Sequence, residues 1–128
     1  MIKREITMVR QLNILVVDDD AENAASIADL FEADNHRVII AYDGQQAIDA
    51  YAAHKFDVGF FDVMMPVKNG VESFLEIRHF NPEAQIYFMT GFSENELLDR
   101  ARAGGAMGVF SKPTDPMLLL DILEKQAA

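Results

Sequence analysis

Carboxylate, hydroxyl and ammonium side chains follow short apolar runs at widely separated points of this chain. The triplet DDD at 18–20 follows NILVV, Asp62 follows DVGFF, Thr90 follows QIYFM, and Lys112 follows AMGVF and one serine. Three carboxylates brought close together repel one another strongly and require a positive charge between them. Oxygen ligands without cysteine or histidine suit a hard cation, and Mg²⁺ is the natural candidate because it shares oxygens with phosphate.

The same group of side chains could carry out phosphoryl chemistry. One carboxylate can attack phosphorus and form an acyl phosphate, while Lys112 and the metal offset the charge of the phosphoryl oxygens. Thr90 can donate a hydrogen bond to one of those oxygens. Taken singly, each residue has an ordinary structural explanation, such as an N-cap for Asp20 or a turn for Asp62. The chemistry therefore depends on elements that bring all of them to one place.

Five apolar runs alternate with helix-length segments. The runs are NILVV at 13–17, RVIIA at 37–41, DVGFF at 57–61, QIYFM at 85–89 and AMGVF at 106–110. They lack polar alternation, as strands covered on both faces of a parallel sheet do. The pattern predicts an α/β fold, a three-layer doubly wound (βα)5 sandwich around a parallel five-stranded sheet. Right-handed crossovers would bring the carboxyl ends of the strands to one edge, where such folds place their sites.

Capping residues support the predicted helices. Capping boxes are expected at Asp43–Gln46, Asn69–Glu72 and Ser93–Glu96. Asp115 followed by Pro116 is typical of an N-cap and the first residue of a helix.

Composition limits the classes of function. The 128 residues carry a net charge of −10, which argues against direct binding of nucleic acid or an anionic membrane. The chain has no cysteine, and no apolar stretch reaches the roughly 20 residues of a membrane span, so a cytoplasmic protein is expected. We expect a short leader at 1–11 and one domain over 12–128. The histidines, at 36, 54 and 79, are expected to be polar surface or capping residues.

Four motifs in order resemble the signature of response-regulator receiver domains. They are VVDDD at 16–20, FFDVMMPVKNG at 60–70, MTG at 89–91 and SKP at 111–113. The resemblance covers roughly residues 12–126. It implies the flavodoxin-like strand order 2-1-3-4-5 and a phosphorylation switch of a two-component system or phosphorelay.

The resemblance also implies roles for individual residues. Asp62 would be the phosphoacceptor and, with Asp19, a direct Mg²⁺ ligand, while Asp18 would act through water. The backbone carbonyl of Met64 would be a third protein ligand. Thr90 would be the hydroxyl that moves toward the phosphoryl group.

In the last motif Lys112 would pair with the phosphoryl oxygens, and its bond to Pro113 would be cis. Such a domain catalyses only its own phosphorylation and slow dephosphorylation, so it is not a turnover enzyme. Its phosphodonor would be a sensor histidine kinase or a histidine phosphotransfer protein.

Three positions depart from the usual receiver pattern. The strand-five aromatic residue three positions before the lysine is replaced by Val109, which has no ring to rotate. The response to phosphorylation is therefore expected to pass through the loop from Gly91 to Glu96. Met64 and Phe92 stand two residues after Asp62 and Thr90, and neither side chain can orient a water molecule. We therefore expect slow loss of the phosphoryl group.

The last helix contains three consecutive leucines, 118–120, next to Met117. A helix buried on one face cannot cover all three, so at least one should be exposed. Two explanations stand equally. The leucines could belong to a dimer or output-partner surface, which in this family often involves the helix after strand four, strand five and the last helix. Alternatively, they could pack against a missing segment.

Three other functions are weighed against the receiver switch. A receiver fold that binds partners without phosphorylation is favoured by Val109 but not by the complete set of acidic, hydroxyl and basic positions. A phosphohydrolase with an aspartyl-phosphate intermediate usually has a second aspartate two residues after the nucleophile, where this chain has Met64. A flavin-binding relative would need a phosphate loop where the DDD triplet stands.

Overall fold

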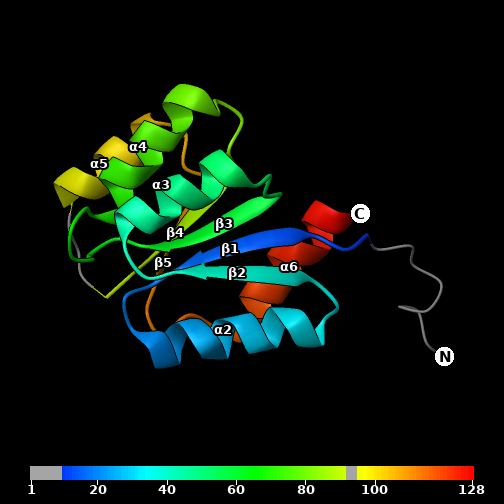
Figure 1. The fold of residues 1–128 in the computed structure, drawn as a ribbon. Coiled ribbons are helices and arrows are strands. Elements are labelled where there is room, and N and C mark those ends of the chain that lie inside the picture. Colours follow the sequence, from blue (N-terminus) through cyan, green and yellow to red (C-terminus); the bar gives the residue numbers. More distant parts are fainter. Residues whose placement is uncertain (1–9, 92–94) are drawn as a thin grey trace, which may run out of the picture.

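The structure is a computed structural model that describes residues 10–91 and 95–128, with five strands alternating with five helices (Figure 1). The strands are β1 (Asn13–Val17), β2 (Arg37–Ala41), β3 (Val58–Asp62), β4 (Ile86–Thr90) and β5 (Gly108–Ser111). The helices are α2 (Ala21–Ala33), α3 (Gly44–Ala53), α4 (Gly70–Phe80), α5 (Asn95–Ala103) and α6 (Pro116–Ala127).

All strand pairs are parallel, and the strand order is β2-β1-β3-β4-β5, which confirms the predicted doubly wound α/β fold. In the register between β1 and β3, Val17 is opposite Phe61. Between β4 and β5, Thr90 is opposite Ser111. The polar residues that end or follow these strands therefore reach the same edge of the sheet.

Three strands, β3, β4 and β5, differ in their bounds from the sequence prediction, and each ends one residue later than predicted. β3 and β4 begin one residue later than predicted and include Asp62 and Thr90 as their last residues. β5 begins two residues later, at Gly108. The residue expected to start β3, Asp57, instead accepts the backbone N–H of Asn13 on its carboxylate at 2.8 Å. Asp62 and Thr90 are thus held by the sheet rather than by flexible loops.

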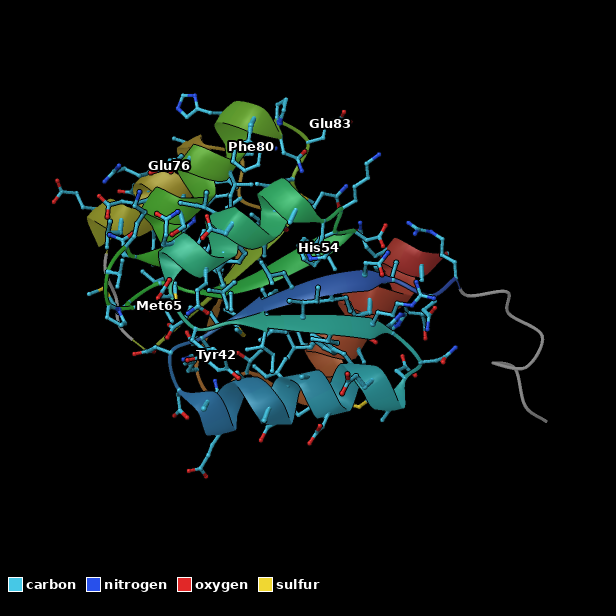
Figure 2. The ribbon with its side chains drawn as sticks, viewed as in Figure 1. Tyr42, His54, Met65, Glu76, Phe80 and Glu83 are labelled. Atoms are coloured by element: carbon cyan, nitrogen blue, oxygen red, sulfur yellow. The ribbon has the colours of Figure 1, made fainter. Side chains whose placement is uncertain are left out.

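Helices cover both faces of the sheet and make two separate cores. Helices α3, α4 and α5 lie on one face and α2 and α6 on the other (Figure 1; with side chains, Figure 2). In the α2/α6 core, Phe60, Tyr87 and Phe110 stack across three neighbouring strands, with centroid separations of 5.5 and 5.7 Å. Phe60 is fully buried, and burial of a side chain of this size contributes about 1.5–3 kcal/mol, whereas Tyr87 and Phe110 are partly buried. This packing helps to hold the strands in place.

The predicted helix starts are largely confirmed. Asp43 accepts the N–H of Gln46, and Asn69 accepts that of Glu72, each at 2.8 Å. The reciprocal half of the capping box does not form at Asp43, because the side chain of Gln46 accepts the N–H of Tyr42 instead. The predicted box at Ser93–Glu96 begins outside the described residues.

At the last helix, Asp115 is the N-cap and Pro116 follows in the first turn, as predicted. The three consecutive leucines, 118–120, differ in exposure, as expected for a helix that is buried on one face. Leu118 is 40% exposed and Leu119 is buried.

His36 is buried, contrary to the expectation that all three histidines are polar surface or capping residues. Its side chain is buried directly before β2, and Nδ1 accepts the backbone N–H of Leu12 at 2.9 Å. The imidazole thus connects two neighbouring segments at the amino end of the sheet.

In the described part of the chain, no helix is both long and apolar enough to cross a membrane.

Candidate functional site

Three aspartates meet at the carboxyl edge of the sheet. Oxygen atoms of Asp18, Asp19 and Asp62 all lie within 4.8 Å of one another. Asp18 is fully buried, Asp62 is 7% exposed, and Asp19 is exposed at the rim. β1 and β3 are neighbours in the sheet, so the residues that end them have to come together. The predicted carboxylate cluster is therefore present.

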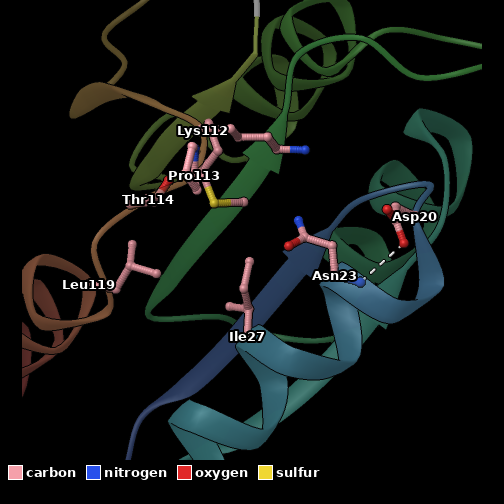
Figure 3. A pocket seen from close by; sticks show the side chains of 8 residues that line it. Asp20, Asn23, Ile27, Lys112, Pro113, Thr114 and Leu119 are labelled. Atoms are coloured by element: carbon pink, nitrogen blue, oxygen red, sulfur yellow. Dashed lines mark hydrogen bonds between the residues drawn. The ribbon is translucent and has the colours of Figure 1, made fainter.

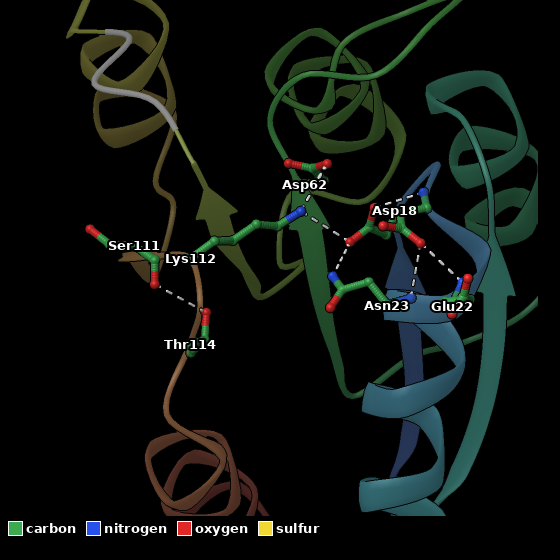
Figure 4. Close-up of polar contacts among 8 residues, drawn as sticks. Asp18, Glu22, Asn23, Asp62, Ser111, Lys112 and Thr114 are labelled. Carbon is green, nitrogen blue, oxygen red and sulfur yellow. Dashed lines mark hydrogen bonds and ion pairs between the residues drawn. The ribbon is translucent and has the colours of Figure 1, made fainter.

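Lys112 supplies the positive charge inside this cluster. It follows β5 and extends across the edge of the sheet, so that Nζ lies 3.2 Å from an oxygen of Asp18 and 3.2 Å from an oxygen of Asp62 (Figure 4). Its backbone N–H donates to the carbonyl of Thr90 at 2.8 Å. The peptide bond between Lys112 and Pro113 is cis, as the resemblance implies.

Asp18 is held by donors on both of its oxygens. Oδ1 accepts the backbone N–H of Asp20 at 3.0 Å, and Oδ2 accepts from Lys112 and from the side-chain amide of Asn23. Asp20 is the N-cap of α2, as predicted, and accepts the N–H groups of Glu22 and Asn23. Asn23 is not among the site residues predicted from the sequence. Its position three residues after an N-cap at a strand end was the available signal, because such a residue faces back toward that strand.

The site retains excess negative charge. Burial raises the pKa of Asp62, and Asp18 and Asp19 raise it further, while Lys112 lowers it without cancelling the increase. Burial alone would lower the pKa of Lys112, but the facing carboxylates of Asp62 and Asp18 outweigh burial and raise it. Three carboxylates and one ammonium group form an oxygen-rich site that fits a hard divalent cation.

The loop after β3 follows the sheet edge closely. Gly70 donates its N–H to the carbonyl of Val63 at 2.8 Å, and a Cβ at position 70 would lie 2.0 Å from the carbonyl oxygen of Asp62. Val67 has a φ of +70°, and Lys68 donates to the carbonyl of Pro66 across it, as in a tight γ-turn. A β-branched residue rarely adopts a positive φ, so this loop is strained.

A hollow of about 380 Å³ opens beside the carboxylates, between α2 and the segment that joins β5 to α6 (Figure 3). Its wall contains Ile27, Met89 and Leu119 as apolar residues, with Asn23 and Lys112 among its polar ones. The site and this hollow thus share two side chains.

The remaining predicted site residues occupy distinct positions. Thr90 is buried at the end of β4, next to β3, and the side chain of Met64 is 43% exposed in the loop after Asp62. Val109 packs partly buried against the α3/α4/α5 core, whereas the neighbouring ring of Phe110 stacks on Tyr87 on the other face. Phe92 lies outside the described residues, as do residues 93 and 94 of the expected response loop.

Proteins similar to this chain include transcriptional regulators and response regulators. The chain is 34% identical over 122 residues to the transcriptional regulatory protein ZraR of Salmonella typhimurium, covering 94% of this chain and 28% of ZraR. It is similar to a CheY-like receiver domain protein from Methanospirillum hungatei, with a TM-score of 0.85 and 25% identity over 91% of this chain and 97% of that one.

A third similar structure contains the modified form of such a site. It is a response regulator from Burkholderia pseudomallei described with a phosphorylated aspartic acid and a calcium ion; its TM-score is 0.80, with 25% identity over 91% of this chain and 69% of that one. The family model "Response regulator receiver domain" matches residues 14–124. With the parallel sheet, the aspartate cluster and these relatives in agreement, the chain belongs to the response-regulator receiver family, whose members are signalling domains rather than classical enzymes.

Proposed function

We propose that Asp62 accepts a phosphoryl group from a phosphohistidine of a sensor histidine kinase or histidine phosphotransfer protein. The observation that carries the proposal is the position of Lys112, whose ammonium nitrogen is 3.2 Å from both Asp18 and Asp62 within a cluster of three carboxylates. Receiver domains interact with kinases and other partner proteins, and this chain spans 28% of the length of ZraR. The identity of its own partner is therefore part of the proposal.

Asp62 is the best placed of the three carboxylates to act as nucleophile. Asp18 is fully buried and accepts three hydrogen bonds, which leaves it little capacity to attack. Asp19 lies exposed at the rim. Asp62 keeps slight solvent access and has the ammonium group of Lys112 beside it, ready to pair with an incoming oxygen.

The proposed step forms one bond and breaks one. A carboxylate oxygen of Asp62 attacks phosphorus, the P–N bond to the donor imidazole breaks, and the imidazole leaves with the electron pair. Lys112 pairs with a phosphoryl oxygen, and Thr90 donates its hydroxyl proton to another. Asp19, Asp62 and the Met64 carbonyl would hold Mg²⁺ directly, with Asp18 acting through water. When bound, Mg²⁺ offsets the negative charge of the phosphoryl oxygens.

Acetyl phosphate with Mg²⁺ and intact-mass analysis tests this proposal. The native chain should gain the mass of one phosphoryl group, the gain should disappear with EDTA, and Asp62→Asn should not gain it. Asp49→Asn, which neutralises an exposed aspartate of α3, is the matched control and should behave like the native chain.

A second function is favoured by one specific observation, the valine at position 109 of β5. Without a ring there, the domain could present its surface to a partner independently of phosphorylation. Beryllofluoride with Mg²⁺ mimics the phosphorylated aspartate and distinguishes the two functions. A rise in melting temperature supports the switch, whereas no rise together with no mass gain supports the phosphorylation-independent binding domain.

The partner surface that we propose includes α5, β5 and α6. Exposed apolar side chains support it: Met107 directly precedes β5, and Met117 and Leu118 lie in the first turn of α6. A second copy of the chain or an output partner would cover them. Sedimentation velocity with and without beryllofluoride tests the homodimer, which predicts faster sedimentation of the beryllofluoride form.

A further inference from the structure

Asn23 is a polar side chain outside the four receiver motifs, yet it contacts the carboxylate cluster. It lies half-buried in the first turn of α2, three residues after the N-cap Asp20. Its amide nitrogen donates to Oδ2 of Asp18, the same oxygen that Lys112 contacts at 3.2 Å (Figure 4). Two donors, one neutral and one charged, therefore share a single carboxylate oxygen.

This sharing satisfies the hydrogen-bonding capacity of that oxygen. A carboxylate oxygen has about two lone-pair sites, and those of Asp18 Oδ2 face Asn23 and Lys112. Asp18 is fully buried, and the donors to this oxygen come from side chains of the protein. Since Asn23 satisfies part of the hydrogen-bonding capacity of the Asp18 carboxylate, Nζ of Lys112 can also stay 3.2 Å from an oxygen of Asp62.

Removal of the amide would change the position of the ammonium group. Asp18 would then have a buried oxygen with one donor fewer, and an unsatisfied buried charge draws the nearest cation toward it. Lys112 is on a flexible stem, so it can move toward Asp18 and away from Asp62. We propose that Asn23 is a positioning residue that keeps Lys112 shared between Asp18 and Asp62; this inference rests on the proposed function.

Without the Asn23 amide, the affinity for Mg²⁺ should rise and the rate of phosphoryl transfer should fall. Without the amide, the positive end of its dipole no longer faces the cluster and Lys112 leaves Asp62, so Mg²⁺ should bind more tightly. At saturating Mg²⁺, phosphoryl transfer should be slower, because the ammonium group no longer stands where the phosphoryl oxygens arrive. General loosening of the site would instead weaken Mg²⁺ binding and slow the transfer together.

The hollow beside the site indicates suitable variants. Asn23 forms part of its wall together with the apolar side chains of Ile27 and Leu119 (Figure 3). Asn23→Leu therefore removes the donor while placing a side chain of similar size against apolar neighbours. Asn23→Gln returns an amide on a longer arm. Ile27→Leu is the matched control one turn along α2, because it changes the same wall without changing a donor to Asp18.

The experiment measures Mg²⁺ affinity by calorimetry and, separately, the rate of phosphorylation by acetyl phosphate at saturating Mg²⁺. For Asn23→Leu we expect Mg²⁺ to bind about fivefold more tightly, the effect of one hydrogen bond on an equilibrium. We expect the maximal rate to fall about tenfold, within the range for loss of one preorganised donor. Asn23→Gln should return both quantities toward native values, and Ile27→Leu should change neither.

The outcomes separate this inference from the function on which it rests. A native chain that binds Mg²⁺ and takes up the phosphoryl group, while Asn23→Leu matches it, overturns the inference alone. Weaker Mg²⁺ binding with a slower rate, or the same changes in Ile27→Leu, also overturns it. A native chain that neither binds Mg²⁺ nor takes up phosphate overturns the proposed function first. Asn23→Ala provides the same comparison if the leucine variant does not fold.

Discussion

Neutralising Asp62 should stabilise this domain when no divalent cation is bound. The reason is that its carboxylate lies almost buried among Asp18, Asp19 and Lys112, and this environment raises its pKa. A raised pKa of an acid means that the folded state favours the neutral form over the charged one. Asp62→Asn keeps the shape of the side chain and removes the charge.

The size of the effect follows from three charge–charge energies and one burial cost. At an effective dielectric constant of about 20, Asp18 at up to 4.8 Å repels Asp62 by about 3.5 kcal/mol, and Lys112 at 3.2 Å attracts it by about 5 kcal/mol. Solvent around the exposed Asp19 screens its repulsion to about 1 kcal/mol. These energies nearly cancel, so the removal mainly relieves the cost of burying a carboxylate. A gain of about 1–2 kcal/mol in unfolding free energy is expected.

Thermal unfolding followed by circular dichroism in EDTA at pH 7 measures this gain. For a domain of this size it corresponds to a melting temperature higher by about 5 °C. An exposed aspartate of α6, in the variant Asp121→Asn, serves as the control and should stay within about 0.5 kcal/mol of the native chain. The reasoning is refuted if Asp62→Asn is no more stable than the native chain under these conditions.

The pH dependence gives a second check on the same cause. Because the folded-state pKa of Asp62 is raised, the stability penalty is absent below the ordinary value of 3.8 and grows as the pH rises through the raised pKa. The advantage of Asp62→Asn should therefore shrink as the pH falls from 7 toward 3.8. Saturating Mg²⁺ at pH 7 should reduce the advantage too, since the native chain gains stability from the bound ion.

Three further predictions concern the loop after β3 and the last helix. Met64→Asn places a side chain that can orient water near the acceptor and should shorten the lifetime of the phosphoryl group, as followed by loss of the added mass. An unchanged lifetime would contradict the explanation that slow loss results from a side chain at position 64 that cannot orient water. Gly70→Ala should destabilise the fold by at least about 3 kcal/mol in urea unfolding, because its Cβ would lie 2.0 Å from a backbone oxygen. Asp115→Ala removes the acceptor for the N–H of Met117 and should cost about 1 kcal/mol by the same measurement, with exposed Asp121→Asn as its control.

The sequence alone determined the alternation of elements and the chemistry of the strand ends. Apolar runs without polar alternation required strands buried on both faces, and the capping residues Asp43, Asn69 and Asp115 marked helix starts that the structure confirms. These signals are local, because they depend on periodicity and on hydrogen bonds within one turn. A parallel sheet with right-handed crossovers then leaves one edge at which the acidic and basic residues can meet.

Tertiary structure decided what depends on neighbours far along the chain. Asn23 contacts Asp18, and His36 is buried at the amino end of the sheet, because of how α2 and β2 pack against β1. Val109 and Phe110 point to opposite faces of β5 because side chains alternate along a strand, and only the sheet position shows which core each one enters. Nζ of Lys112 likewise lies 3.2 Å from a carboxylate oxygen of each of two aspartates, Asp18 and Asp62. These residues are far apart in sequence, so their spacing along the chain does not predict the distances.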